Sequence, residues 1–266
     1  MHFVKSHGIG NDFVIIEDTE GYDVSKLARL LCDRHFGVGS DGLLIYEKSP
    51  DADFRMRMFN PDGSEAEMCG NGIRCITLYA YKKCPKRSFK VETKIGILDC
   101  DVTSTEPFKV RVNMGQPKDI SSHLLQMEGK SFKLTLVSMG NPHAVNFVDD
   151  VSVIPLRELG PKIENHPDFP NRTNVEFVQV VDRGHVIVRV WERGAGETLA
   201  CGSGACAVAV ASIVNNYTDN IVEVTLPGGK LNIEWDRDKG IFMEGPAEEV
   251  FSGKLDDEYL KFRLRR

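Results

Sequence analysis

Met68-Cys69-Gly70-Asn71-Gly72-Ile73-Arg74-Cys75 and Ala200-Cys201-Gly202-Ser203-Gly204-Ala205-Cys206 are two versions of one stretch of sequence. In each version a cysteine stands directly before a Gly-x-Gly step that leads into residues compatible with a helix. The pattern predicts that Cys69 and Cys201 each lie at the N-terminus of a helix. Half of the 266-residue chain separates the two cysteines, so the sequence also predicts an internal duplication.

The duplication extends beyond the cysteine motifs. Glu65 and Glu197 each lie four residues before their cysteine, and Gly10-Asn11 and Gly140-Asn141 precede the two cysteines by similar lengths. We therefore expect two halves, residues 1–115 with Cys69 and residues 116–249 with Cys201. Each half is long enough to bury a core of its own.

The composition is that of an ordinary globular protein, with 41% hydrophobic and 27% charged residues. The net charge is -6 and the one basic run is the short tail from Arg263 to Arg266, which argues against nucleic acid as a partner. The longest apolar run, which begins at Ala205, is about ten residues long and too short to span a bilayer. A small-molecule partner, with no role for a membrane, is therefore expected.

The cysteines argue against disulfides and metal. Seven cysteines without a disulfide-framework spacing, and an N-terminus without a signal-peptide pattern, predict a cytoplasmic protein. No Cys-x-x-Cys or His-x-x-x-His pair is present, so no metal site is expected. Cys75 and Cys206, inside the expected helices, are interpreted as core residues.

Alternation of apolar and polar residues predicts many short strands, and helices are expected after Asp23 or Ser25, after each cysteine motif, and within residues 151–165. The expected strands cover residues 1–4, 11–17, 43–47, 54–59, 88–93, 96–102 and 108–114, then 132–137, 144–148, 174–181, 185–191, 222–226, 231–235 and 240–244. This order predicts an α+β fold. The helix from Ala205 to Val214 is apolar on every side, which predicts that it lies at the centre of its half, wrapped by strands. The helix after Cys69 carries little charge beyond Arg74, and we expect the same place for it.

A cysteine at a helix N-terminus lies beside unpaired backbone N–H groups and the positive end of the helix dipole, which favour its thiolate. The glycines that follow let a carboxylate approach those N–H groups. Two such thiols on opposite sides of an amino-acid α-carbon can invert it, because one removes the proton and the other returns a proton from the opposite face. The dipole contributes only about 0.3–2 kcal/mol. Fixed N–H donors aimed at the carboxylate must therefore lower most of the barrier.

Seven segments together resemble the diaminopimelate epimerase family, in the family's order and over nearly the whole chain. They are Gly8-Ile9-Gly10-Asn11-Asp12-Phe13, Arg34 to Gly42, Asn60-Pro61-Asp62-Gly63-Ser64, Cys69 to Arg74, Gly140-Asn141-Pro142-His143, Trp191-Glu192-Arg193-Gly194 and Ala200 to Gly204. The resemblance implies two pseudo-symmetric halves, each a β-barrel-like mixed sheet around a central helix. It also implies that the tail, residues 250–266, returns to the first half and that the chain pairs as a homodimer.

The activity that the resemblance implies is a two-base interconversion of LL- and meso-2,6-diaminopimelate in lysine biosynthesis, without a cofactor. Cys69 and Cys201 match the acid/base pair, and His143 and Glu192 match positions that assist catalysis. The residues that match substrate-binding positions are Asn11, Asn60, Gly70, Asn71, Asn141, Asn174, Glu192, Arg193, Gly202 and Ser203. Gly42 departs from a glutamine that some members carry, so it is not counted as a site residue.

Other functions remain open from the residues alone. A proline or hydroxyproline racemase-like enzyme would share the architecture, although Asn60, Asn174 and Arg193 suit a substrate with a second charged end. In a carboxylate-binding protein without activity, the two cysteines would only pack. A pyridoxal-dependent enzyme would carry a coloured lysine adduct.

Overall fold

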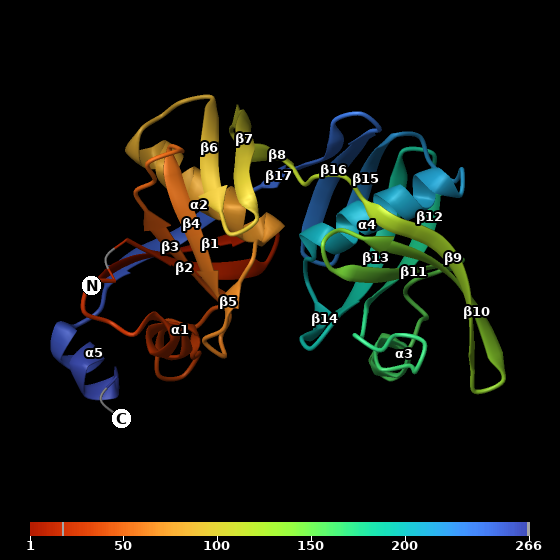
Figure 1. Ribbon diagram of the computed structural model, residues 1–266, viewed down its shortest axis with the longest axis horizontal. Coiled ribbons are helices and arrows are strands. Elements are labelled where there is room, and N and C mark those ends of the chain that lie inside the picture. The colour runs from red at the N-terminus through yellow and green to blue at the C-terminus, as the bar shows by residue number, and fades with distance from the viewer. Residues whose placement is uncertain (18, 265–266) are drawn as a thin grey trace. The chain divides into compact units, whose positions relative to one another are not determined.

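The computed structural model describes residues 1–17 and 19–264, which form two compact units (Figure 1). Unit 1 comprises Met1–Val112 and the segment from Gly245 onward, and unit 2 comprises Asn113–Glu244. The sequence predicts boundaries between the two halves after residues 115 and 249, whereas the two units divide after residues 112 and 244. The second boundary moves because the strand that begins at Glu248 pairs with the first strand of unit 1.

Unit 1 contains nine strands and three helices among the described residues. The strands are β1 (His2–Gly8), β2 (Asn11–Ile16), β3 (Gly42–Glu47), β4 (Phe54–Phe59), β5 (Glu65–Ala66), β6 (Ser88–Thr93), β7 (Gly96–Thr105), β8 (Phe108–Asn113) and β18 (Glu248–Lys254). The helices are α1 (Val24–Cys32), α2 (Gly70–Lys83) and α5 (Asp257–Leu264). Asp23 caps α1 by accepting a hydrogen bond from the Lys26 backbone N–H, as one of the two expected caps.

Unit 2 contains nine strands and two helices among the described residues. The strands are β9 (Lys118–Met127), β10 (Lys130–Ser138), β11 (Pro142–Phe147), β12 (Asn174–Asp182), β13 (His185–Glu192), β14 (Gly196–Thr198), β15 (Ile221–Leu226), β16 (Gly229–Asp236) and β17 (Gly240–Pro246). The helices are α3 (Leu156–Glu164) and α4 (Gly202–Val214).

The strands pair in the same order in both units. In unit 1 the order is β18-β1-β2-β3-β4-β6-β7-β8, with β5 also paired to β4. In unit 2 it is β9-β10-β11-β12-β13-β15-β16-β17, with β14 also paired to β13. The parallel pairs fall at equivalent places, β2–β3 and β4–β6 in one unit and β11–β12 and β13–β15 in the other. The predicted α+β class with two pseudo-symmetric halves is therefore confirmed.

Each unit has a buried central helix, as the sequence predicts (Figure 1). Every residue of α4 from Ala205 to Ser212 is buried, and the helix contacts β10, β11, β12, β13, β15 and β16. In unit 1, α2 is buried from Gly70 to Leu78 and contacts β1, β2, β3, β4 and β18. A helix without a polar face finds apolar neighbours on all sides only in such a position.

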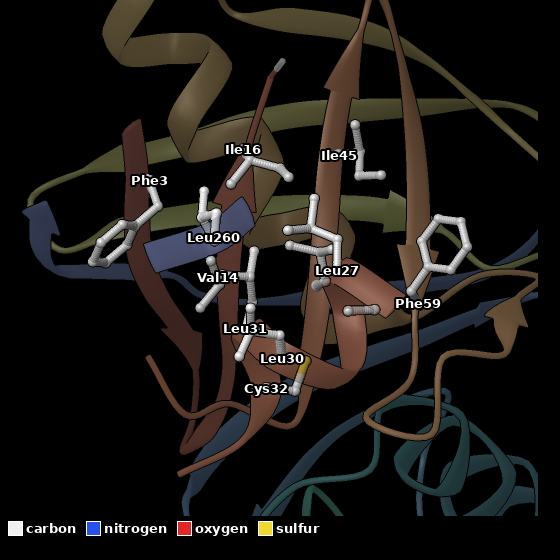
Figure 2. Packing of buried hydrophobic residues seen from close by; sticks show 12 residues of the cluster. Phe3, Val14, Ile16, Leu27, Leu30, Leu31, Cys32, Ile45, Phe59 and Leu260 are labelled. Carbon is white, nitrogen blue, oxygen red and sulfur yellow. The ribbon is translucent and has the colours of Figure 1, made fainter. Parts of the chain in front are cut away.

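A second helix covers the outer side of each sheet. In unit 1, Leu27 and Leu31 of α1 are fully buried against Val14, Ile16 and other strand residues, and burial of each leucine contributes roughly 1.5–3 kcal/mol. Figure 2 shows Leu260 of α5 in the same cluster. In unit 2, α3 packs in the same way through Leu156 and Ile163. Across the described residues, no helix is both long and apolar enough to cross a membrane.

Candidate active site

Cys69 is the N-cap residue of α2, as predicted. Its backbone is extended, and its Sγ atom accepts a hydrogen bond from the Gly72 N–H at 3.4 Å. Gly72 packs closely against the sheet, since a Cβ atom there would lie 3.2 Å from Leu44 Cδ2 on β3. The glycine therefore lets the start of α2 lie against the sheet and leaves the thiol at the helix end.

Asn11 and Asn71 lie beside the Cys69 thiol. Asn11 Oδ1 accepts a hydrogen bond from Asn71 Nδ2 at 3.1 Å and lies 3.8 Å from Cys69 Sγ. Asn11 Nδ2 donates to Asp41 Oδ2 at 2.9 Å. Unit 1 thus brings together three of the residues that the sequence assigns to the site, and Asp41 is an additional anchor that sequence reasoning missed.

Arg34 Nη2 donates hydrogen bonds to both Asp12 Oδ1, at 2.9 Å, and Asp41 Oδ1, at 2.8 Å. Asp12 also accepts a hydrogen bond from Lys5 Nζ at 2.6 Å. Burial raises the pKa of Asp12, but the hydrogen bonds from Arg34 and Lys5 and the charge of Lys5 outweigh burial and hold this pKa at about 2. The carboxylates that support Asn11 are therefore fixed by charge-assisted bonds.

Arg74 is fully buried in the first turns of α2. Its guanidinium donates to Gly70 O and Asn71 Oδ1, each at 3.0 Å, and to Pro246 O at 3.1 Å. Arg74 therefore joins the helix start to Pro246 of the same unit and orients the Asn71 amide. The remaining predicted residue of unit 1, Asn60, lies in the turn after β4, where its side chain donates to Ser64 Oγ at 3.0 Å.

Cys201 is the N-cap residue of α4 and is 4% exposed. Its Sγ atom lies 3.7 Å from Ser203 Oγ. Burial raises the pKa of the Cys201 thiol well above its usual value, and the carboxyl groups of Glu192 and Glu176 raise it further. Hydrogen bonds from Gly204 N–H and Ser203 act in the opposite direction. The sequence predicts a favoured thiolate at the helix N-terminus, whereas burial and two nearby carboxyl groups favour the protonated form of Cys201.

His143 lies on β11 and is 1% exposed. Its Nδ1 atom is 2.6 Å from Glu176 Oε1, and its Nε2 atom is 3.1 Å from Asn141 Oδ1. Asn141 Nδ2 in turn donates to Ser203 Oγ at 3.3 Å. Unit 2 thus joins three predicted site residues, His143, Asn141 and Ser203, in one hydrogen-bonded chain that ends beside Cys201.

Asn174, Glu192 and Arg193 lie where β12 begins and β13 ends. Asn174 Oδ1 accepts a hydrogen bond from the Arg193 backbone N–H at 2.9 Å, and Asn174 Nδ2 donates to Pro142 O at 2.7 Å. Glu192 Oε1 accepts from Thr198 Oγ1 at 2.6 Å. The exposed Arg193 guanidinium donates to Asn171 O at 3.1 Å. These side chains combine carboxylate, amide and guanidinium groups at the ends of two inner strands, and such groups are suited to a zwitterionic ligand.

Glu176 is the principal residue that sequence reasoning missed. It is fully buried near the start of β12, and the stretch Asn174-Val175-Glu176-Phe177-Val178 offers one signal, a carboxyl group between apolar residues. Among the described residues, no group of three or more His, Cys, Asp or Glu side chains is arranged to hold a metal ion.

A known protein family matches most of the chain. The protein-family model described as diaminopimelate epimerase matches residues 3–120 and 135–250. The chain belongs to the diaminopimelate epimerase family. A diaminopimelate epimerase of Pelotomaculum thermopropionicum is 48% identical over 275 residues, which cover 96% of this chain and 98% of that protein. The resemblance that the seven sequence segments carry is therefore confirmed.

Solved structures of more distant proteins share the fold. A phenazine biosynthesis protein of the PhzF family from Bacillus anthracis matches with a TM-score of 0.73 at 20% identity, over 96% of this chain and 99% of that one. A hydroxyproline epimerase from Agrobacterium vitis with bound trans-4-hydroxy-L-proline matches with a TM-score of 0.71 at 14% identity, over 95% and 91%. At these identities the likeness concerns the fold alone.

Proposed function

We propose that the protein interconverts LL- and meso-2,6-diaminopimelate without a cofactor, as a step of lysine biosynthesis. The observation that carries the proposal is the equivalence of Cys69 and Cys201, each the N-cap of the central helix of its unit. Family membership and the 48% identity to a diaminopimelate epimerase support the choice of substrate.

In the proposed reaction the two thiols act on opposite faces of one α-carbon. A thiolate removes the α-proton, the electron pair is delocalised into the substrate carboxylate, and the opposite thiol returns a proton to the other face. The cysteines then exchange protonation states. Backbone N–H groups at Gly70-Asn71 and Gly202-Ser203 bind the carboxylate as its charge grows, and exclusion of water strengthens these bonds.

The remaining assigned residues recognise the substrate or assist the thiols. We propose that Asn11, Asn60, Asn141 and Asn174 bind its polar groups. Arg193 binds the distal carboxylate, and Glu192 accepts from an ammonium group. His143 assists proton transfer near Cys201, which its hydrogen-bonded connection through Asn141 and Ser203 supports.

The test is incubation of the purified, reduced protein with LL-diaminopimelate in D2O. We expect inversion together with uptake of one deuterium at the α-carbon, and abolition of inversion by Cys69→Ala or by Cys201→Ala. Cys84→Ala, which removes an exposed thiol, is the matched control and should keep full activity. Absence of both inversion and exchange in the wild-type protein would refute the proposal, and inversion of proline or hydroxyproline instead would favour the racemase-like alternative.

Assembly and location are part of the same proposal. We infer a homodimer, which is supported by the exposed apolar side chains Val250 and Phe251 on β18 of unit 1. Val250→Lys should then shift the mass measured by light scattering from a dimer toward a monomer. We infer a cytoplasmic location because a mechanism with two thiols requires a reducing compartment.

A further inference from the structure

Unit 2 contains a buried ionisable pair that the fold does not explain. The side chains of His143 and Glu176 are both 0% exposed, with 2.6 Å between His143 Nδ1 and Glu176 Oε1. The second carboxyl oxygen, Glu176 Oε2, is buried without a hydrogen-bond partner within the described part of the chain. Burial raises the pKa of Glu176, while the charge and hydrogen bond of His143 oppose this.

The internal duplication supplies a comparison. In β11 and β12, His143 pairs with Asn174, and Val145 pairs with Glu176. In the equivalent parallel strands β2 and β3, Phe13 pairs with Gly42, and Ile15 pairs with Leu44. Phe13 therefore corresponds to His143, and Leu44 corresponds to Glu176.

The central helices give the same correspondence. Gly72 and Gly204 each lie three residues after the N-cap cysteine of their helix. A Cβ atom on Gly72 would lie 3.2 Å from Leu44 Cδ2, and a Cβ atom on Gly204 would lie 3.0 Å from Glu176 Oε1. The leucine and the glutamate thus lie against the same turn of equivalent helices.

Phe13 and Leu44 are both 0% exposed, so two apolar side chains fill these positions in unit 1. The same fold therefore forms in unit 1 with uncharged side chains at the positions of His143 and Glu176. A buried carboxyl group and imidazole are costly to desolvate, and a pair of this kind is often no more stabilising than well-packed apolar residues. Their presence in unit 2 alone points to a role in chemistry rather than in folding.

The pair is connected to Cys201. His143 Nε2 contacts Asn141 Oδ1, Asn141 donates to Ser203 Oγ, and Ser203 Oγ lies 3.7 Å from Cys201 Sγ. The titratable groups that face this cluster are His143 from β11, Glu176 from β12, Glu192 from β13 and Cys201 at the start of α4. Two carboxyl groups near one thiol favour its protonated form.

We propose that Glu176 is a positioning residue, which orients His143 toward Asn141 and acts together with the burial of Cys201 and with Glu192 to keep Cys201 as the protonated thiol of the pair in the substrate-free enzyme. This inference rests on the proposed epimerase function. A two-base inversion needs one thiolate and one thiol at the start of each turnover, and two identical half-sites would not decide which cysteine holds the proton. Glu176 of unit 2 occupies the position that Leu44 occupies in unit 1, and this difference distinguishes the surroundings of the two cysteines.

The first test uses Glu176→Gln and needs no substrate. Alkylation of Cys201 by iodoacetamide is followed by peptide mass spectrometry between pH 7 and 11, because the pKa of this buried thiol lies well above its usual value. Loss of the carboxylate should move the pH of half-maximal alkylation downward by about one unit, so that Cys201 reacts roughly tenfold faster near pH 8. Glu197→Gln, which removes a partner of Arg189 in the same unit, is the control and should leave this pH unchanged.

The second test measures epimerisation. Glu176→Gln should lower kcat by roughly tenfold or more with little change in KM, and should move the limb of the kcat/KM pH profile that reports Cys201 toward lower pH, because this thiol loses a neighbouring negative charge. A merely structural role would reduce the amount of folded enzyme and leave the limbs in place. Unchanged limbs together with unchanged Cys201 alkylation would overturn the proposal.

A double variant places the apolar residues of unit 1 at the equivalent positions of unit 2. His143→Phe with Glu176→Leu should fold with a melting temperature at or above that of the wild type, lose epimerisation, and show the faster alkylation of Cys201. A large fall in melting temperature would contradict the inference that the pair is dispensable for folding. An inactive wild-type protein would refute the proposed function alone, because the alkylation test of Glu176 and Cys201 does not depend on diaminopimelate.

Discussion

Asn11 donates a hydrogen bond to Asp41 Oδ2 over 2.9 Å, and this bond fixes which end of the Asn11 amide faces Cys69. The carbonyl oxygen of Asn11 lies 3.8 Å from Cys69 Sγ and accepts from Asn71. An unsupported amide can rotate and present its NH2 group to the thiol instead. Asp41 therefore sets the polarity of the surroundings of Cys69, although no motif assigns it to the site.

Asp41→Ala should lower kcat/KM for LL-diaminopimelate by about tenfold, the effect of losing one charge-assisted hydrogen bond that orients Asn11. Asp53→Ala is the matched control, since it removes an ion pair with Lys86 and a bond to the Lys90 backbone elsewhere in unit 1. Steady-state kinetics on both variants measures the difference. Equal losses in the two variants would show that Asp41 acts only through general stability.

The thiols outside the site should differ widely in reactivity. Burial raises the pKa of Cys75 and of Cys100 to about 12, so only about one molecule in ten thousand carries either thiolate at pH 8. Cys84 is exposed. Mass spectrometry after brief alkylation should find Cys84 modified, with Cys75 and Cys100 modified only in denaturant. Rapid labelling of Cys75 in the folded protein would contradict its assignment to the core.

Much of the fold could be predicted because the core-forming elements repeat a pattern. The apolar face of α1, the Asp23 cap and the all-round apolar α4 are local signals that the tertiary structure preserves. The strands β9 and β18 and the helix α5 were not predicted. Most residues of β9 and β18 are exposed or only half-buried, so these strands lack the alternation that marks a strand with one buried face.

The cysteines of the candidate site could be predicted because each stands beside glycine in a repeated motif. Glu176 could not be predicted, because its role depends on residues that are distant in the sequence. Cys69 and Cys201 are visible as a repeated motif. Glu176 contacts His143, which lies 33 positions earlier, and this contact depends on the parallel pairing of β11 with β12. The sequence shows a carboxyl group within an apolar stretch, but no local pattern shows that Glu176 meets His143. The raised pKa of Cys201 could not be predicted for the same reason, since it arises from burial and from the carboxyl groups of Glu192 and Glu176, which lie on strands distant from Cys201 in the sequence.

Acid should weaken unit 1 through Asp12. Its pKa falls from 3.8 to about 2 on folding, so the carboxylate contributes stability above about pH 4 and loses it as the pH falls through 2. After allowance for solvent screening, the contribution is about 1–2 kcal/mol. Chemical denaturation of the wild type and Asp12→Asn should therefore show a gap in unfolding free energy at pH 6 that narrows by pH 2.5. A constant gap would contradict this linkage.

Gly72 and Gly204 offer a matched pair of substitutions, because each is the third residue after its N-cap cysteine. Alanine in place of helical glycine reduces the entropy lost on folding, worth roughly 0.5–1 kcal/mol at either position. The surroundings differ. A Cβ atom on Gly72 meets Leu44, a flexible apolar side chain, at 3.2 Å, whereas a Cβ atom on Gly204 meets Glu176 Oε1 at 3.0 Å and Cys201 Sγ at 3.2 Å.

Gly204→Ala should therefore displace the thiol and the carboxyl group together and lower kcat by roughly 100-fold, as expected when a reacting group moves by a fraction of an ångström to one ångström. Gly72→Ala requires only that Leu44 give way, so its kcat should fall much less, while both variants keep melting temperatures near that of the wild type. Kinetics and thermal unfolding on the two proteins check this. A kcat loss in Gly72→Ala as large as that in Gly204→Ala would mean that the helix start itself, and not the positions of Glu176 and Cys201 beside Gly204, determines the rate.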